Sequence, residues 1–316
     1  MASGYAITSS QAAVRQAGNP TQARWRISSR ATAVVMLAPL AIGLLLFAVY
    51  PLLYLVALSL TESTLGDPFR AFMGLGNYSW LLSRWDFPAA LLRTLLFAIP
   101  VALLQMVLGV ALAVLLIDLR RHSSLVRSVI LLPLMTPPLL VGVAWKLILA
   151  PGGGLLNGVL QRWGITSGPI SFLGSEPWAS LSLFVADTWQ WTPFVAILAY
   201  AALLQVPDDI REAAQIDGAR PSVIFWRIVL PIAAPGLIAV LLLRIIMAFK
   251  TFDLVYILTF GGPGYATSYA SFVIWQSGLQ KFDVGTAAAQ TVIFALFVSL
   301  VTLPILWLHK YSERHQ

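Results

Sequence analysis

The chain has 316 residues, of which 59% are hydrophobic and 10% are charged. A water-soluble domain needs a polar surface that this composition cannot supply, so we expect an integral membrane protein. The sequence has no cysteine and three histidines, which excludes a disulfide framework and argues against a metal centre. The net charge of +7 comes from basic residues at the ends of apolar runs, a placement typical of topology determinants rather than of a nucleic-acid-binding face.

Residues 1–30 are polar and show no hydrophobic periodicity, so we interpret them as a cytoplasmic tail. A cleaved signal peptide is the alternative. The apolar stretch that follows is far longer than the core of about 7–15 residues in such peptides, and no small-residue cleavage site interrupts it. We therefore expect a retained first span, a membrane domain over residues 31–310 and a short cytoplasmic tail at 311–316.

Six apolar runs are long enough to cross roughly 30 Å of hydrocarbon, which takes about 18 residues or more. They predict an all-α membrane protein with six transmembrane helices. Several of the runs contain proline, whose missing N–H must be compensated by packing against protein or a watery path. In chain order the predicted spans are Ala33–Leu60, Leu91–Ile117, Val126–Leu149, Leu181–Leu204, Ile228–Leu258 and Thr286–Leu308.

The basic residues between these runs predict the orientation. The two tails and the second and fourth connections, counted with Arg127 at the start of the third run, hold twelve Lys and Arg residues, whereas the other three connections, counted with Lys250 in the fifth run, hold five. Because cytoplasmic loops are enriched in Lys and Arg, both termini and the segment 207–231 are expected in the cytoplasm.

The segment 207–231 is a long polar interruption and predicts a short helix–turn–helix. Pro207 suits a first helical residue, and Asp208 and Asp209 complement the positive end of the helix dipole. Gly218 can adopt the left-handed conformation that ends a helix, and Pro221 opens a second helix. The small side chains predict a low-relief surface with apolar anchors, suited to a protein partner; these residues are Ala213, Ala214 and Ala219, with Ile210 and Phe225 as anchors.

The spacing in this segment adds a specific resemblance. Glu212-Ala213-Ala214 is followed after three residues by Gly218, and after nine more by Ile228-Val229-Leu230-Pro231. Glu-Ala-Ala alone could occur by chance in any amphipathic helix, but the full spacing resembles the EAA loop of ABC-importer permeases. The resemblance implies docking into a cleft of a separate ATPase subunit, and the implied coupling residues are Glu212, Ala213, Ala214, Asp217, Gly218 and Ala219.

A second resemblance lies at the end of the fifth run. Residues 252–263, FDLVYILTFGGP, with Thr267 beyond, resemble a segment of carbohydrate-importer permeases of the MalF type. Further matching positions are Pro133, Pro137, Gly142, Asn157 and Gly285. The implied substrate is a sugar or related polyhydroxylated solute. Polyols and glycerol phosphate remain alternatives.

The sequence has no Gly-x-x-x-x-Gly-Lys-Ser/Thr phosphate loop, so ATP and magnesium are expected on a partner rather than on this chain. No arrangement of nucleophile and base suggests an enzyme. The resemblance implies a second permease of related fold, two ATPase subunits and an extracytoplasmic solute-binding protein, all at a bacterial or archaeal plasma membrane.

Polar residues inside the apolar runs are the candidates for a substrate path, because they usually face the bundle interior or a wet cavity. Arg244 lies about sixteen residues into the fifth run, roughly 24 Å along a helix. Indole rings can stack on a sugar, and carboxylates can accept its hydroxyl hydrogens. The candidates are Arg244, Lys250, Asp253, Asp187, Trp189 and Trp191. An Arg–Asp pair that only holds helices together, with the tryptophans as an interfacial belt, explains the same residues.

Two other functions remain as alternatives. The first is an ion-coupled secondary transporter in which Arg244 and Asp253 form the coupling pair. The second is a membrane scaffold without a transport role. Neither accounts for the spacing from Glu212 to Pro231.

Overall fold

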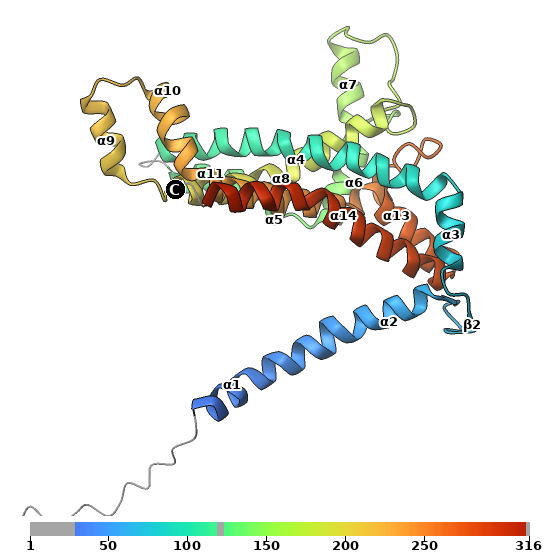
Figure 1. Cartoon of the computed structure of the whole chain (residues 1–316). Helices are drawn as coiled ribbons and strands as arrows, with labels where there is room; N and C mark the ends of the chain where they lie inside the picture. Colours follow the sequence, from blue (N-terminus) through green and yellow to red (C-terminus); the bar gives the residue numbers. More distant parts are fainter. Residues whose placement is uncertain (1–28, 119–122, 314–316) are drawn as a thin grey trace, which may run out of the picture. The chain divides into compact units, whose positions relative to one another are not determined.

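The computed structural model describes residues 29–118 and 123–313, which are almost entirely helical (Figure 1). The predicted N-terminal tail lies outside these residues except for its last two, which begin a helix. The chain divides into two compact units, residues 1–54 and 55–316, which we describe separately.

The first unit contains one long apolar helix. Its parts are α1 (Ser29–Leu44), the π-helical turn η2 (Leu45–Val49) and the start of α2 (Tyr50–Ser59). The stretch Ala33–Ser59 is long and apolar enough to span a membrane. The predicted first span, Ala33–Leu60, is therefore confirmed as a helix to within one residue. A helix that is apolar on all sides requires lipid or another protein around it.

The second unit begins with the end of α2, from Leu55, and continues into a small antiparallel hairpin that pairs Thr61 with Phe72. The elements that follow, up to Glu313, are helices. In order the elements are β1 (Thr61–Glu62), β2 (Ala71–Phe72), α3 (Gly76–Ser83), α4 (Asp86–Asp118), α5 (Ser123–Met135), α6 (Pro138–Ile148), α7 (Leu155–Arg162), α8 (Trp178–Leu203), α9 (Asp208–Ile216), α10 (Pro221–Ile224), η3 (Phe225–Val229), α11 (Leu230–Phe249), α12 (Asp253–Leu258), α13 (Ala270–Trp275), η4 (Gln276–Gln280) and α14 (Val284–Glu313).

Four described helices could cross a membrane by length and composition, or up to six if two bent pairs each count as one span. The predicted third span, Val126–Leu149, is wrong as a single helix: α5 and α6 meet at a bend of 96°. Pro137 and Pro138 explain the break, since proline lacks an N–H and disfavours helical geometry in the residue before it.

The predicted fifth span, Ile228–Leu258, also needs correction. Its helix begins seven residues earlier, at Pro221, and continues through η3 into α11. It is interrupted after Phe249, and the short α12 starts at Asp253. The second, fourth and sixth spans begin within five residues of their predicted starts, in α4, α8 and α14.

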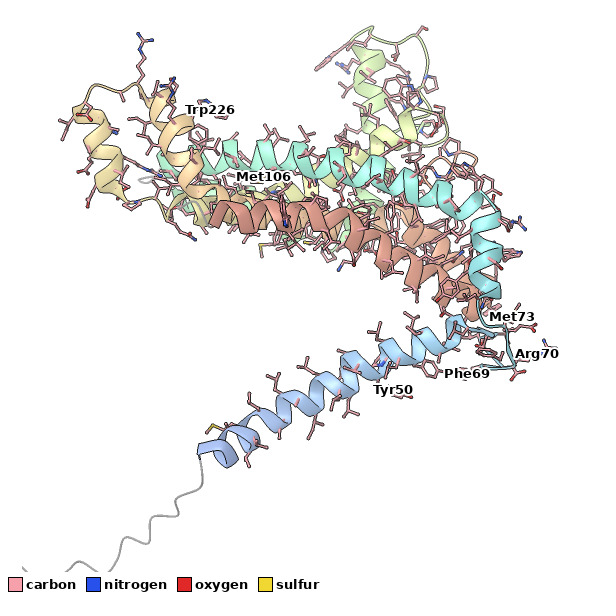
Figure 2. The ribbon with its side chains drawn as sticks, viewed as in Figure 1. Tyr50, Phe69, Arg70, Met73, Met106 and Trp226 are labelled. Carbon is pink, nitrogen blue, oxygen red and sulfur yellow. The ribbon has the colours of Figure 1, made fainter. Side chains whose placement is uncertain are left out.

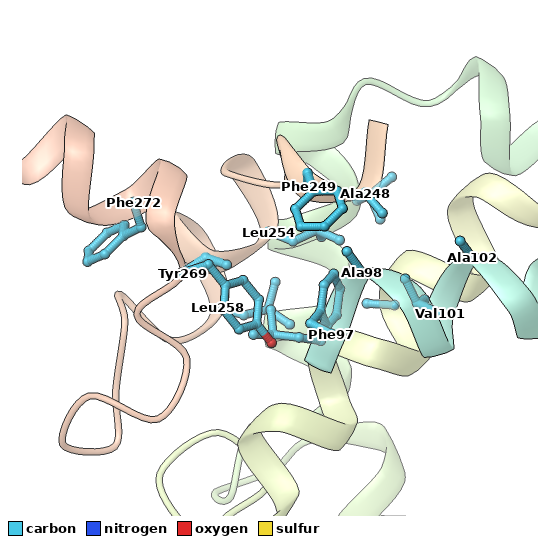
Figure 3. Close-up of a cluster of buried hydrophobic side chains, with 14 of the residues drawn as sticks. Phe97, Ala98, Val101, Ala102, Ala248, Phe249, Leu254, Leu258, Tyr269 and Phe272 are labelled. Atoms are coloured by element: carbon cyan, nitrogen blue, oxygen red, sulfur yellow. The ribbon is translucent and has the colours of Figure 1, made fainter. Parts of the chain in front are cut away.

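The core of the second unit lies where α4 and α8 run along each other. Close approach requires a glycine, because a Cβ on Gly109 would lie 2.6 Å from Val195 Cγ1. One buried apolar cluster, around Phe97 and Phe249, joins α4, α8, α11 and the 254–272 segment (Figure 3). A second cluster, around Leu203 and Ile224, joins α4 and α8 to α9 and α10. Helices α9 and α10 thus lie at one end of this unit, and α3 and α13 at the other (Figure 1).

Candidate functional site

The segment 207–231 forms the expected helix–turn–helix. Pro207 is extended, with φ −58° and ψ 135°, so it precedes α9 rather than starting it. Asp208 and Asp209 occupy the first turn, as predicted. Gly218 has φ +78° and nothing within 4 Å of an added Cβ, so its requirement is the left-handed backbone and not space.

Only part of the expected docking surface is exposed. Glu212, Ala213, Asp217 and Gly218 are exposed, and Ala219 is half-buried. Ala214 is 9% exposed because it packs in the cluster with Leu203 and Ile224, so its assignment to the outward surface is wrong. The expected anchor Phe225 is half-buried against the same cluster.

An apolar residue that sequence reasoning missed stands on the outside of α9. Ile216 is 86% exposed, and Ile210 is 41% exposed. We use the name "α9 surface" for the exposed residues Ile210, Glu212, Ala213, Ile216, Asp217 and Gly218. An unpartnered isoleucine beside two carboxylates is a signal for a protein contact that could have been found from the sequence.

The α9 surface is fastened to the transmembrane helices in two ways. Arg211 donates a hydrogen bond from Nη2 to the Leu203 carbonyl oxygen at 3.0 Å, which satisfies a backbone acceptor at the end of α8. On the other side, α10 runs through η3 into α11 without a break. Helix α9 is thus connected to both α8 and α11.

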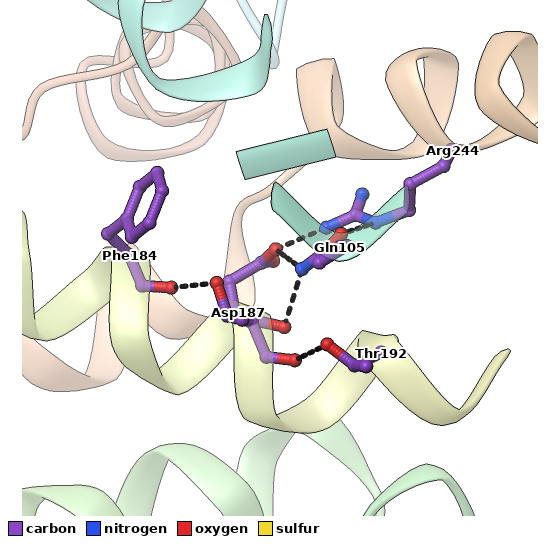
Figure 4. A network of polar contacts seen from close by, with 6 residues as sticks. Gln105, Phe184, Asp187, Thr192 and Arg244 are labelled. Atoms are coloured by element: carbon purple, nitrogen blue, oxygen red, sulfur yellow. Dashed lines mark hydrogen bonds and ion pairs between the residues drawn. The ribbon is translucent and has the colours of Figure 1, made fainter. Parts of the chain in front are cut away.

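A buried polar network links the three central helices (Figure 4). Arg244 on α11 donates to Gln105 Oε1 on α4 and to Asp187 Oδ2 on α8. Gln105 Nε2 donates to the Asp187 carboxylate and to its carbonyl oxygen, both at 2.9 Å. Each of the three side chains is at most 1% exposed. The Arg244 guanidinium also lies 5.6 Å from the centre of the Trp191 ring.

This network bears on the two sequence-based interpretations of Arg244, a substrate contact and a structural ion pair. It forms the intramembrane Arg–Asp pair that was the alternative to a substrate contact, and its partner is Asp187. The proposed pairing of Arg244 with Asp253 is wrong, because Asp253 is exposed in the first turn of α12, beyond the helix break. Gln105 was missed. The sequence did contain a signal for it, because a glutamine in the middle of an apolar run usually faces the interior of the helix bundle.

A cavity of about 160 Å³ lies beside the network. It brings together four of the six predicted path residues, namely Asp187, Trp191, Lys250 and Asp253. Arg244 stands behind Asp187, and Trp189 lies elsewhere, packed edge-on against Trp145 with ring centres 6.2 Å apart.

The cavity also contains an acceptor that the sequence did not single out. Gln190 is 2% exposed, and its Oε1 makes no hydrogen bond within the described residues. A buried amide oxygen without a partner is costly unless a donor arrives. Lys250 adds a donor and the Trp191 indole an apolar face. The volume of about 160 Å³ is below the range of small-molecule sites, about 300–1,000 Å³, so in this conformation the cavity accommodates part of a hydroxylated molecule rather than a whole disaccharide.

A larger groove, of about 650 Å³, has the wrong chemistry for such a molecule. It lies between α4 and the α10–α11 segment, and Figure 2 shows Met106 and Trp226 on these two elements. Its lining residues are almost all apolar. The groove therefore suits lipid tails or an apolar helix.

The motif Gly261-Gly262-Pro263 forms a loop and does not line the cavity beside Asp187. Thr267 Oγ1 donates to the Gly262 carbonyl oxygen at 2.7 Å, and Ser268 Oγ donates to that of Gly261 at 3.0 Å. Gly261 has φ +82°, and a Cβ there would lie 2.6 Å from Ser268 Oγ. The positive φ and the close approach of Ser268 both require glycine at position 261 of this loop.

Broken apolar helices around a buried polar network, with a helical loop fastened to two of them, define a multi-span membrane transport protein. Residues 105–316 match the family described as "Binding-protein-dependent transport system inner membrane component". The chain belongs to this family, and it is the permease subunit of an ABC importer rather than an enzyme.

Relatives match along most of the chain. It is 32% identical to the trehalose/maltose transport system permease protein MalF of Thermococcus litoralis, over 86% of this chain and 92% of the relative. It is 32% identical to the sn-glycerol-3-phosphate transport system permease protein UgpA of Agrobacterium fabrum, over 73% and 78%. Its fold is similar to a bacterial ABC transporter for the import of alginate, with a TM-score of 0.78 and 22% identity over 89% of this chain and 95% of the other.

Proposed function

We propose that this permease carries an uncharged sugar or related polyhydroxylated solute into the cytoplasm by alternating access. The observation that carries the proposal is the cavity beside Asp187, where the buried Gln190 Oε1 lacks a hydrogen-bond donor. Solute hydroxyls can donate to this oxygen and to the Asp187 carboxylate, while Trp191 offers an apolar ring face. Relatives named for trehalose and maltose support the same class of solute.

The charges around the cavity favour a neutral solute over glycerol phosphate. Arg244 is buried and already paired with Asp187. The two remaining charged residues, Lys250 and Asp253, have opposite signs. A phosphate would need an uncompensated positive charge, which this cavity does not offer. The ion-coupled alternative required Arg244 and Asp253 to form a pair, but Arg244 pairs with Asp187 instead.

We further propose that the α9 surface docks into a cleft on a cytoplasmic ATPase subunit, which holds the ATP and magnesium. Glu212, Ala213, Asp217 and Gly218 would face the ATPase, while Ala214 and Ala219 would fit α9 to the permease itself. The exposed Ile216 and the connection of α9 to α8 and α11 support this role. Two ATPases, a second related permease and an extracytoplasmic solute-binding protein would complete the importer.

This assignment requires both termini in the cytoplasm of a bacterial or archaeal cell, with α9 on the same side. ATP binding would close the two ATPases and draw the coupling helices together. The helices would then rock from an inward-open to an outward-open state, in which the binding protein delivers the solute.

The test is uptake by the assembled importer in proteoliposomes, with radiolabelled trehalose and sn-glycerol 3-phosphate as probes. We expect ATP-dependent, vanadate-sensitive uptake of trehalose. Gln190→Met should reduce uptake at least tenfold at unchanged protein level, while Gln161→Met, on the exposed side of α7, should not. Equal uptake by the two variants would refute the role of the cavity.

The coupling role is tested separately. Glu212→Ala and Gly218→Trp should abolish uptake and solute-stimulated ATP hydrolysis while the permease remains in the membrane. Gly153→Trp is the matched control, because Gly153 also has a positive φ, of +76°, and open space around it, but lies far from α9 in the chain. Normal transport by Gly218→Trp would contradict the proposed docking.

A further inference from the structure

A second polar cavity, of about 440 Å³, lies near the end of the unit opposite to α9. The first turns of α4, the start of α8 and the loop before α13 form its walls. Four polar side chains line it, namely Arg93, Glu176, Ser180 and Tyr269, together with the aromatic rings of Phe97 and Phe184. None of them lines the cavity beside Asp187.

The polar groups are held in place but keep hydrogen-bonding capacity. Arg93 donates from Nε to the Ser268 carbonyl oxygen at 3.3 Å. Its other N–H groups make no hydrogen bond within the part of the chain that the structure describes. Ser180 Oγ lies 3.4 Å from Glu176 Oε1, so one carboxylate oxygen of this exposed residue is left for another donor.

Tyr269 is the buried member of the set. It is 3% exposed, and its ring lies against Phe97 with centres 4.8 Å apart (Figure 3). Tyr269 lines the cavity, and its hydroxyl makes no hydrogen bond within the described residues, so it is available to a bound molecule. Burial raises the pKa of this hydroxyl, and the negative charges of Asp187 and Glu176 raise it further. The hydroxyl therefore stays protonated at neutral pH and can donate.

Phe97 and Phe184 meet edge to face, with centres 6.4 Å apart, and add an apolar surface to these groups. Arg93 and Glu176 cancel in charge, so the lining favours a neutral molecule with several hydroxyls. The Glu176 carboxylate would repel a phosphate. The volume lies within the range of small-molecule sites, about 300–1,000 Å³.

We propose that this cavity is a second binding site for an uncharged polyhydroxylated solute, separate from the cavity beside Asp187. The inference rests on the proposed function, because it assumes the same class of solute. Glu176 accepts hydroxyl hydrogens, Arg93 and Tyr269 donate to hydroxyl oxygens, and the phenylalanine rings contact the C–H face. Under the proposed orientation, the site lies at the outer end of the transmembrane helices, where solute enters.

The experiment measures equilibrium binding of radiolabelled trehalose, maltose and glycerol to the importer in nanodiscs without ATP and without its solute-binding protein, which would itself bind the probes. A Gln190→Met background removes the first site. In that background we expect one remaining saturable site for at least one probe. Tyr269→Phe should weaken it about fivefold and Glu176→Gln about tenfold or more, from the loss of a neutral and a charged hydrogen bond. Tyr265→Phe, a 75% exposed tyrosine of the same loop, should change nothing.

The outcomes distinguish this site from the proposed function. If the Gln190→Met background binds none of the probes, or if Tyr269→Phe and Glu176→Gln bind as Tyr265→Phe does, the second site is refuted while the uptake test stands by itself. If phosphatidylethanolamine co-purifies with the wild type and is lost only in Glu176→Gln, the cavity holds a lipid headgroup and the proposal is also refuted. Absence of ATP-dependent uptake would instead refute the proposed function.

Discussion

Removing the Asp187 carboxylate should destabilise the permease far more than removing any surface charge. Asp187 and Arg244 are each 1% exposed, and they join α8 to α11. In Asp187→Ala the guanidinium would keep only Gln105 Oε1 and the Trp191 ring as partners. Breaking a buried ion pair on one side costs about 3–5 kcal/mol, because a charge is left without compensation. That cost lowers the ratio of folded to unfolded protein by about two to three and a half orders of magnitude.

The double variant Asp187→Leu/Arg244→Met separates the charge from the packing. It removes both charges and fills the space with apolar side chains, so it should recover at least half of the stability lost in Asp187→Ala. Gln105 keeps its hydrogen bond to the Asp187 carbonyl oxygen, which is backbone. The double variant should still fail in uptake, because Asp187 also lines the cavity.

The assay is the fraction of monodisperse importer that survives heating, measured by fluorescence-detected size-exclusion chromatography, with uptake in proteoliposomes beside it. Glu62→Ala is the control: the Arg70–Glu62 pair spans 3.7 Å with side chains 61% and 52% exposed. Such a pair contributes about 0–1 kcal/mol. Two results would refute the reasoning: Asp187→Ala as stable as Glu62→Ala, or a double variant no more stable than Asp187→Ala.

Two further predictions concern close packing and the loop between α6 and α8. Gly109→Ala should lower stability by about 1–3 kcal/mol in the same heating assay, because its Cβ would lie 2.6 Å from Val195 Cγ1. The control Gly158→Ala, which has open space on α7, should be neutral or slightly stabilising. Similar shifts for both variants would contradict the packing of α4 on α8. Asn157→Ala should speed proteolysis of the 150–177 segment, because Asn157 holds the Ala150 carbonyl and both backbone groups of Ile170, and each group left unpaired costs about 1–3 kcal/mol. Gln161→Ala, exposed on α7, is its control, and equal cleavage rates would count against this role.

The apolar runs alone determined that this is a helical membrane protein, because the lack of water in a bilayer leaves helices as the simplest way to pair the backbone. They also located the first, second, fourth and sixth spans. The helix end at Gly218 was equally predictable, since few residues other than glycine adopt a left-handed φ without strain. These features depend on local sequence, and the local sequence was sufficient.

The partners of the buried charges were decided only by the tertiary structure. Arg244 is nine residues from Asp253 in the chain but bonds to Asp187, 57 residues away, and to Gln105, 139 residues away. The helix break after Phe249 places Asp253 at an exposed helix start, and the packing of α4, α8 and α11 brings the other three together. Hydrophobic periodicity shows that a side chain is expected to face inward. It does not show which helix stands opposite, because that depends on how the whole bundle fills its interior.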